Sequence, residues 1–365
     1  MQGAGNPILL LVSAVDLNSG VFFLLVALYA LPWILLIAGV IALIVLITKN
    51  GGADKEETLE TMQRRVIALG FFDGVHLGHA VLLDLVRVRA KELGAVPAVL
   101  TFDTHPRGVV QGDQTPLIND LNARIDLIRR LHGSSDVLVL PLPFDEALRS
   151  MPWDAFLPFL QREYGAVHVV CGYDYRFGFQ GAGNPERLKE QCGTLGIGVD
   201  VVPEVLLDGV PVSSTYIREL LSAGDMERAG RFLGHPHVLL GVVRHGYKLG
   251  RTLGAPTINM EFPEGVIVPP RGVYAMRVFL PGEAEGRFAV TNVGVRPTVD
   301  REAEPRVTVE SYIIDFDGDL YGQEIRVEFY RYLRPEVRFE DVGDLKAQIQ
   351  RDVEEARRHF GYENK

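Results

Sequence analysis

Two histidines stand three residues apart in the stretch Gly70–His79, directly after the apolar run Val66–Leu69. The run is β-branched, the turn after it is rich in glycine, and Ala80–Leu93 has a helical pattern, which together predict a strand, a loop and a helix. His76 and His79 would then lie at the start of the helix, beside backbone N–H groups without partners. Such a position attracts phosphate, and an imidazole can donate to phosphate oxygens. The expected ligand is a nucleoside triphosphate.

A hydroxyl-rich segment later in the chain could bind the same kind of ligand. Ser213, Ser214 and Thr215 stand at the predicted start of another helix, where their hydroxyls can cap free amides and donate to phosphate oxygens. Arg218 follows, and its planar guanidinium can hold phosphate through parallel hydrogen bonds. Taken alone, the segment is more often an ordinary helix cap followed by a surface arginine.

An acidic residue in the carboxyl-terminal half could act as a base. Glu310 stands alone among the apolar neighbours Val307 and Val309 on a predicted strand. Apolar surroundings would raise its pKa toward the range that suits a general base. The other interpretation is an exposed glutamate on an edge strand, and the residues alone leave both open.

The first half of the chain has the alternation that would position the histidines. From Val66 to about Val202, short apolar runs alternate with amphipathic stretches, which predicts an α/β fold with a doubly wound parallel sheet. Ligands of such sheets lie beyond the carboxyl ends of the strands, where the histidine loop emerges. The expected strands are Val66–Leu69, Val96–Phe102, Val137–Leu140, Val167–Cys171 and Gly198–Val202. The expected helices are Ala80–Leu93, Asn119–Leu131, Trp153–Tyr164, Pro185–Leu195, Thr215–Leu221 and Asp225–Leu233.

After Gly234 the pattern changes to strands separated by glycine and proline turns, which predicts an antiparallel β-barrel or sandwich. Its expected strands are Val238–Arg244, Gly272–Leu280, Arg287–Asn292, Arg306–Phe316 and Glu324–Tyr332. A charged amphipathic helix, Phe339–His359, ends the chain. We therefore divide the sequence into residues 1–61, 62–234 and 235–365.

Composition excludes some classes of partner. A chain of 365 residues is too long for one ordinary core and favours two domains. The net charge of −10 argues against binding to nucleic acid or to an anionic membrane surface. Two cysteines, Cys171 and Cys192, are too few for a disulfide scaffold, so we expect buried thiols and a reducing compartment.

The amino-terminal segment differs from the rest. No residue from Val21 to Ile47 is charged, and this run is long enough to cross a bilayer as one tilted or kinked helix. Lys49 and Lys55 follow it while no Lys or Arg precedes it, which favours cytoplasmic catalytic domains tethered to the membrane. Alternatively, Met62 begins the protein and residues 1–61 are an upstream reading frame.

The motifs together resemble one enzyme family. His76-Leu77-Gly78-His79 is similar to the HxGH signature of nucleotidyltransferases, and Gly250–Asn259 resembles the riboflavin kinase signature GRxLGxPTxN. Further matches to the same family are Thr101–Arg107, Cys171–Gly178, the SSTxIR-like Ser213–Arg218, Thr291–Thr298, Val309–Phe316, Tyr321-Gly322 and Leu333–Phe339. About residues 64 to 360 thus resemble the bifunctional riboflavin kinase/FAD synthetases of bacteria.

The resemblance implies two reactions on small molecules, with ATP as co-substrate in both. Residues 235–365 would phosphorylate riboflavin to FMN, and residues 62–234 would adenylylate FMN to FAD. Nothing in the sequence suggests a tunnel, so we expect FMN to pass between the sites through solution. The implied catalytic residues are Glu310 as general base in the kinase, and His76, His79 and Arg218 in adenylyl transfer. The implied binding residues are Gly70, Phe72, Asp73, Gly74, Gly78, Asp174, Ser213, Ser214, Thr215, Gly250, Arg251, Thr257, Asn259, Asn292 and Arg334, with Thr257 and Asn259 also holding Mg²⁺.

Some departures from the family pattern keep other functions open. Thr104 stands where the family usually has Pro, Ala255 and Ile258 replace the usual Phe and Ala, and Tyr216 lies inside the SSTxIR segment. A kinase with a degenerate adenylyltransferase site is one alternative. A membrane-tethered module that binds or delivers flavin is another. A pantetheine-phosphate or nicotinamide-mononucleotide adenylyltransferase would not explain the carboxyl-terminal motifs.

Overall fold

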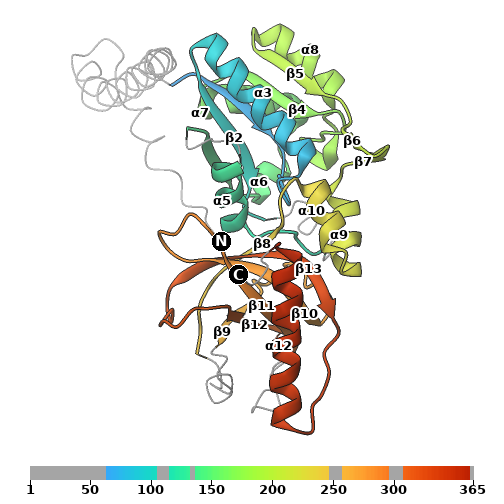
Figure 1. Cartoon of the computed structure of the whole chain (residues 1–365). Helices are drawn as coiled ribbons and strands as arrows, with labels where there is room; N and C mark the ends of the chain where they lie inside the picture. Colours follow the sequence, from blue (N-terminus) through green and yellow to red (C-terminus); the bar gives the residue numbers. More distant parts are fainter. Residues whose placement is uncertain (1–62, 105–114, 132–135, 246–256, 296–306, 362–365) are drawn as a thin grey trace, which may run out of the picture. The chain divides into compact units, whose positions relative to one another are not determined.

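The structure, a computed structural model, describes residues 63–104, 115–131, 136–245, 257–295 and 307–361 (Figure 1). The apolar run Val21–Ile47, part of the second motif (His105–Arg107), and the predicted ligand-binding Gly250 and Arg251 lie outside these ranges. Within them, no helix combines the length and the apolar character that a bilayer crossing requires.

The first half of the described chain is a five-stranded parallel sheet with strand order β3-β2-β1-β4-β5. The strands are β1 (Arg65–Leu69), β2 (Val96–Phe102), β3 (Leu138–Leu142), β4 (Ala166–Gly172) and β5 (Gly198–Val202). The strand order reverses at β1, so the predicted doubly wound sheet is confirmed. The histidine loop leaves the carboxyl end of this central strand.

Helices cover both faces of the parallel sheet (Figure 1). The helices of this half are α3 (Leu77–Leu93), α5 (Leu121–Leu131), α6 (Glu146–Arg149), α7 (Trp153–Tyr164) and α8 (Pro185–Leu195). Val66 and Ala68 of β1 pack in one core with side chains of α3 and α5. Ile67 and Leu69 pack in the other core with α7 and α8. Successive side chains of a strand point to opposite faces, so this single strand contributes to both layers.

Two short helices and a small hairpin complete this half. The hairpin is β6 (Leu206–Leu207) with β7 (Val210–Pro211), and the helices are α9 (Ser214–Ala223) and α10 (Met226–Leu233). Ser213 caps α9, because its side chain accepts a hydrogen bond from the backbone N–H of Tyr216. Gly224 ends the helix in the left-handed conformation, with φ of 79°.

The second half is a six-stranded antiparallel sheet with strand order β8-β13-β10-β11-β12-β9. Its strands are β8 (His237–Val242), β9 (Thr257–Glu261), β10 (Gly272–Phe279), β11 (Arg287–Val295), β12 (Val307–Ile313) and β13 (Glu324–Arg334). The chain just after β8 returns to the other edge strand, where the N–H of Arg244 donates to the carbonyl of Asn259 at 2.8 Å. The sheet therefore curls into the predicted barrel, and α12 (Val342–His359) packs on its outside.

Two expectations about strands were wrong, each for a physical reason. Thr257–Asn259 was expected only as the end of a ligand-binding signature, but it belongs to a sixth strand of the barrel, Thr257–Glu261. The glycines and the proline that precede it hid a short alternating run. β3 was expected to end at Leu140, but it continues through Pro141. A proline is tolerated there because β3 is an edge strand.

Specific backbone contacts join the two halves, which lie in one compact unit, Gln63–Lys365. The Asn119 side chain donates to the carbonyl of Val238 on β8 at 2.8 Å. Leu117 pairs in parallel with Val266 of the segment after β9. The chain just before α5 therefore contacts both edges of the barrel sheet or their continuations.

Candidate functional site

The two histidines of the predicted phosphate site form a stacked pair at the start of α3. Their ring centroids are 3.6 Å apart and their planes differ by 14°. His76 caps the helix, because its Nδ1 accepts a hydrogen bond from the backbone N–H of His79 at 3.3 Å. His79 also packs against the ring of Phe72, with centroids 4.9 Å apart. The structure thus brings both imidazoles together where the sequence predicted them.

Burial keeps both imidazoles uncharged. Desolvation is the largest of the causes that together lower the pKa of His76 from 6.5 to about 3, and the charges of nearby His235 and Arg218 act in the same direction. The pKa of His79 is also well below its ordinary value, chiefly because of burial and secondly because of His76. Since Nδ1 of His76 accepts a hydrogen bond, its proton lies on Nε2. His76 can therefore offer one N–H donor to an anion without carrying a charge.

Gly78 makes room for the His76 ring. A Cβ atom at position 78 would lie 3.1 Å from both Cε1 and Nδ1 of His76. Few real Cβ atoms come this close to a neighbour, and the ring would have to move. The glycine between the two histidines therefore lets the first imidazole lie where it does without a small shift of its ring.

The loop before the helix has an unusual backbone. Phe72, Gly74 and Val75 have positive φ angles of 58°, 80° and 42°. Such angles are costly for a bulky or β-branched residue, and strained backbones of this kind occur at ligand sites. At Gly74 a Cβ would also approach Ile118 to 2.9 Å. The predicted Gly70 faces the Phe72 ring, 3.0 Å from the place of its missing Cβ.

Asp73 is a buried anchor for this loop. Its carboxylate, 2% exposed, accepts hydrogen bonds from the backbone N–H groups of Ile118 and Asn119. It also accepts one from Nη2 of Arg218 at 2.6 Å. The Nε of Arg218 donates to the carbonyl of Pro116 at 2.8 Å. Two nitrogen atoms of the Arg218 guanidinium thus donate to protein groups, whereas the sequence led us to expect this guanidinium to bind phosphate.

A cavity of about 380 Å³ lies in front of these groups. Its walls include most of the residues that the sequence predicted for adenylyl transfer: Gly70, Phe72, Asp73, His76, Gly78, His79, Asp174, Ser213, Ser214, Thr215 and Arg218. The hydroxyl of Ser214 donates to the carbonyl of Asp73 at 2.9 Å, which ties α9 to the histidine loop. Residues 141 positions apart in the sequence therefore line one site.

Sequence reasoning missed one buried cation beside this cavity. Arg124 of α5 is fully buried and donates to the carbonyls of Phe71 and Phe102, both of which line the cavity. No motif contains Arg124. Its position in a helical pattern, one turn after Asp120, gave no signal beyond that of an ordinary helix residue.

The kinase residues predicted in the barrel fall on one line across its strands. Glu310 of β12 lies directly opposite Asn259 of β9 on one side and opposite Asn292 of β11 on the other. Asn292 in turn pairs with Val273 of β10, and Val273 with Arg334 of β13. Directly opposite residues of antiparallel strands point to the same face. The register therefore places these predicted side chains in one row.

Thr257 lies two residues from Asn259 on the same face of β9, opposite Tyr312. It also lines a small pocket with Phe316 and the segment Asp319–Tyr321. Hydroxyl and amide oxygens side by side are hard ligands of the kind that Mg²⁺ prefers, so the donor set fits the predicted metal. The described residues contain no cluster of three or more His, Cys, Asp or Glu side chains able to hold a metal ion.

Two predicted flavin-binding residues already have protein partners. Arg334 donates through Nε and Nη2 to the buried carboxylate of Asp352 on α12, at 2.9 and 2.7 Å. Asn292 donates to the carboxylate of Glu336 at 3.0 Å. These contacts fix the end of β13 and the segment after it against the rest of the barrel. Flavin binding by these two residues stays a prediction.

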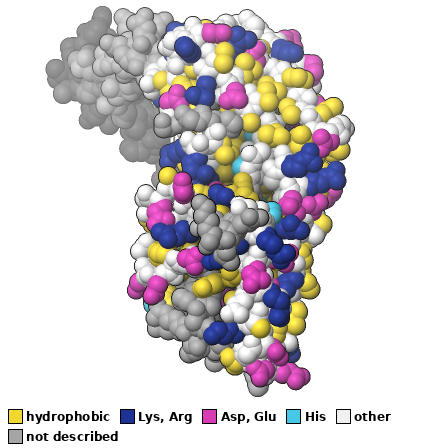
Figure 2. All heavy atoms as spheres, viewed as in Figure 1, with side chains coloured by type: hydrophobic (Ala, Val, Ile, Leu, Met, Phe, Trp, Pro, Cys, Tyr) yellow, Lys and Arg dark blue, Asp and Glu magenta, His cyan; other side chains and the backbone are white. Residues whose placement is uncertain are grey.

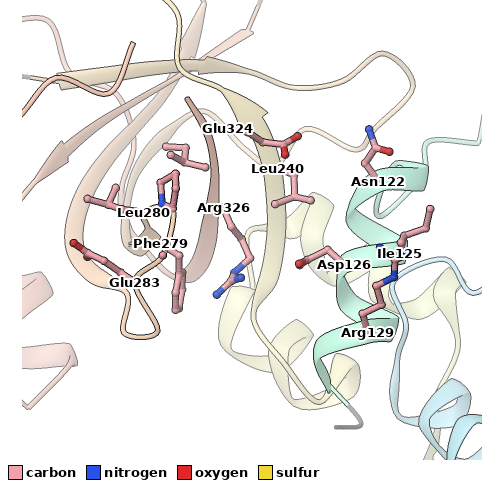
Figure 3. Close-up of a pocket in the computed structure, with 13 residues that line it drawn as sticks. Asn122, Ile125, Asp126, Arg129, Leu240, Phe279, Leu280, Glu283, Glu324 and Arg326 are labelled. Carbon is pink, nitrogen blue, oxygen red and sulfur yellow. The ribbon is translucent and has the colours of Figure 1, made fainter. Parts of the chain in front are cut away.

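A larger cavity, about 620 Å³, lies between α5 and the barrel and contains none of the motif residues (Figure 3). Arg326 lies over the Phe279 ring at 3.8 Å on one side of it, and Asp126 and Arg129 of α5 lie on the other (Figure 3). Its lining has charges of both signs and indicates no ligand class. Acidic and basic side chains are likewise interspersed over the face seen in Figure 2.

The two cysteines are buried and free, as the sequence led us to expect of inert thiols. Burial raises the pKa of the Cys171 thiol to about 12 and that of the Cys192 thiol to about 11. Both thiols are therefore protonated and unreactive near neutral pH.

The fold and the two sites together define a class of protein, an adenylyltransferase domain followed by a flavin kinase barrel. Residues 58–216 match the FAD synthetase family, and residues 233–360 match the riboflavin kinase family. The bifunctional riboflavin kinase/FMN adenylyltransferase of Bacillus subtilis is 35% identical over 303 residues, which span 82% of this chain and 94% of its own. The protein of the same name from Pseudomonas fluorescens is 37% identical over 80% of this chain and 92% of its own. This chain belongs to the bifunctional riboflavin kinase/FMN adenylyltransferase family, and it is an enzyme.

One solved structure has the same arrangement over both domains. It is a crystal structure described as a macrolide-efflux protein from Streptococcus pneumoniae, 28% identical, with a TM-score of 0.70. The match covers 82% of this chain and 96% of that one. The two proteins therefore share the fold from the parallel sheet to the barrel.

The buried neutral His76 predicts a loss of stability in mild acid. The unfolded chain binds a proton on this residue near pH 6.5, while the folded chain does so only at about pH 3. The stabilising effect of the uncharged ring is therefore complete above pH 6.5 and is lost as the pH falls. For this one residue the loss between pH 6.5 and about pH 5.5 should be about 1 kcal/mol.

Urea unfolding of the wild type and of His76→Asn at both pH values measures this contribution. Asn keeps a helix-capping oxygen but does not titrate, so its free energy of unfolding should fall by about 1 kcal/mol less over the same interval. Equal losses in the two proteins would show that His76 is not the group responsible.

Proposed function

We propose that this chain makes FAD from riboflavin in two steps at two separate sites, with domains at residues 62–234 and 235–365. The barrel transfers the γ-phosphate of ATP to riboflavin, and the parallel-sheet domain transfers the adenylyl group of a second ATP to FMN. The observation that carries the proposal is that one chain holds both a stacked imidazole pair in a cavity and an oxygen-rich row on a barrel.

Adenylyl transfer needs positioning and charge stabilisation rather than a protein nucleophile. The phosphate of FMN attacks the α-phosphorus of ATP, and pyrophosphate leaves. His76 donates from Nε2 to the α-phosphate, where negative charge builds up in the transition state. An uncharged imidazole suits this role, because it loses less hydration free energy on burial than a charged imidazolium would. Arg218, paired with Asp73, lines the same cavity and can donate to phosphate oxygens through its remaining N–H groups.

Several residues that the sequence predicted to bind the nucleotide position other residues of the site instead. Asp73 holds Arg218 and the amides of Ile118 and Asn119, so it positions rather than binds. Ser213 caps α9, and Ser214 connects that helix to the histidine loop. Thr215 and Asp174 line the cavity and are the members of this set that we assign to nucleotide binding.

In the barrel, Glu310 is the general base that takes the proton of the ribityl 5′-hydroxyl as its oxygen attacks the γ-phosphorus. Thr257 and Asn259 would hold Mg²⁺ with ATP, and when bound the metal neutralises phosphate charge. The cross-strand pairing of Glu310 with Asn259 supports this assignment, since it places the base beside the phosphate-binding strand.

We also propose that the apolar run Val21–Ile47 tethers the catalytic domains to the membrane. The matches to curated relatives span 80–82% of this chain, and the FAD synthetase match begins at residue 58. The support for the tether is therefore the hydropathy of this run. Cell fractionation of the full chain should place it with membranes, while a chain that begins at Met62 should be soluble; identical fractions would exclude an anchor.

Gly78→Ala should separate catalysis from stability. Alanine at a helical position usually stabilises by about 0.5–1 kcal/mol relative to glycine, but here its Cβ would displace the His76 ring. We expect the kcat for FMN adenylylation to fall about tenfold, with riboflavin phosphorylation by the same protein unchanged. Steady-state assays with FMN or riboflavin as substrate measure the two rates.

Gly193→Ala is the matched control. Gly193 lies in α8, and a Cβ there meets no atom within 4 Å. This variant should be at least as stable as the wild type and keep both activities. Full FAD synthesis by Gly78→Ala would contradict the role of the His76 ring position.

Glu310→Gln should reduce FMN formation from riboflavin by a factor of 10² to 10⁴, on the order expected for loss of a general base. Added FMN should still be converted to FAD at the wild-type rate. Asn259→Ala should have the same pattern.

The exposed Glu285→Gln in the same barrel is the control and should keep both activities. If Glu310→Gln stopped both conversions equally, the assignment of the two reactions to two sites would be wrong.

A further inference from the structure

Arg124 lies behind the adenylyl-transfer cavity and joins two strand ends. It is 0% exposed, and its Nη1 donates to the carbonyl of Phe71 at 2.7 Å and to Oγ1 of Thr101 at 2.9 Å. Its Nη2 donates to the carbonyl of Phe102 at 2.9 Å. Phe71 follows β1 and Phe102 ends β2. One guanidinium therefore fixes the carboxyl ends of two neighbouring strands relative to each other.

These contacts set the direction of peptide groups beside the cavity. In a trans peptide the C=O and the following N–H point in opposite directions. Because the carbonyl of Phe71 points to Arg124, the N–H of Phe72 points away from it. The guanidinium also lies over the Phe71 ring, 4.2 Å from its centroid. Both the backbone and the side chain of Phe71 are thus held from one side.

The histidine loop and the start of α5 hold each other. Asp73 of the loop accepts hydrogen bonds from the backbone of Ile118 and Asn119, just before the helix. Arg124, on the first turns of the helix, donates to the backbone of the loop at Phe71. The loop side chain Asp73 thus binds the backbone before α5, and the helix side chain Arg124 binds the backbone of the loop. Removal of either should loosen the strained turn at residues 72–75.

The charge of Arg124 is available to the site. Its acceptors among the described contacts are two carbonyls and a hydroxyl, all of them neutral. A guanidinium held by neutral oxygens keeps its charge in a low-dielectric interior, although the nearby carboxylates of Asp73, Asp103 and Asp120 compensate part of its field. The effect reaches the imidazoles, since the Arg124 charge is one of the causes that lower the pKa of His79.

We infer that Arg124 is a positioning residue for FMN adenylylation: it fixes the strand ends that carry the histidine loop and places a permanent positive charge behind them. This inference rests on the proposed adenylyltransferase activity. Arg124 acts on the reaction through the backbone of Phe71 and Phe102 rather than by contact with ATP or FMN.

The experiment compares Arg124→Lys and Arg124→Met with the wild type in the full chain. Met keeps much of the volume but has neither charge nor donors, so the kcat for conversion of FMN to FAD should fall about 100-fold. Lys keeps the charge without the planar fork, so the loss should be about tenfold. Riboflavin phosphorylation by the same molecules should stay within about twofold of the wild type, because the kinase site lies in the barrel.

Arg129→Met is the matched control. Arg129 is on the same helix, is exposed, and lines the cavity between α5 and the barrel. It should keep the wild-type rate of FAD formation. Thermal unfolding of every variant monitors the fold, and if Arg124→Met does not fold, Arg124→Lys alone carries the test.

Wild-type FAD formation by folded Arg124→Lys and Arg124→Met would overturn the inference. So would a parallel loss of both activities in folded Arg124→Lys, because that result means a general structural role. A wild-type protein that makes no FAD from FMN and ATP would instead refute the proposed function itself. The two failures are therefore distinguishable in one set of assays.

Discussion

The buried carboxylate of Asp73 is the contact on which the adenylyl-transfer site depends. It is held by two backbone amides of the segment before α5 and by Arg218 of α9, so three parts of the chain meet at one side chain. A buried anion is costly unless it is paired and fully hydrogen-bonded, and here both conditions are met. The same segment continues to Asn119, which donates to β8 of the barrel. The histidine loop is therefore connected to both domains through one carboxylate.

The chemistry of the two sites differs in how each handles charge. In the parallel-sheet domain, burial makes the paired imidazoles neutral, and two guanidinium groups lie near them: Arg218, which is paired with Asp73, and Arg124, which is held by neutral oxygens. Neutral donors with permanent cations behind them can receive a highly charged nucleotide and stabilise the charge that develops later. In the barrel, oxygen ligands and a carboxylate lie in one row, an arrangement suited to a metal-bound phosphate and a proton acceptor.

Local sequence was enough for most of the fold. The alternation of strands and helices predicted the doubly wound sheet, and the run of strands after Gly234 predicted the barrel. The histidine pair was placed correctly at the start of a helix, because strand, glycine turn and helix follow each other within 30 residues. The sequence did not predict β9, because glycine and proline before Thr257 concealed a strand that pairs with the distant β12 and forms a single bridge to Arg244, just after β8.

By itself, then, the sequence determined the class of fold, the histidine loop and the identity of the polar residues that could do chemistry, because these depend on near neighbours and on periodicity. Only the tertiary structure decided that Asn259, Glu310 and Asn292 share a row, since the register of three distant strands sets it. It alone also assigned Asp73 and Arg334 to protein partners and brought Arg124 to the ends of two strands. Burial and long-range hydrogen bonds belong to the folded chain, and no local pattern of residues encodes them.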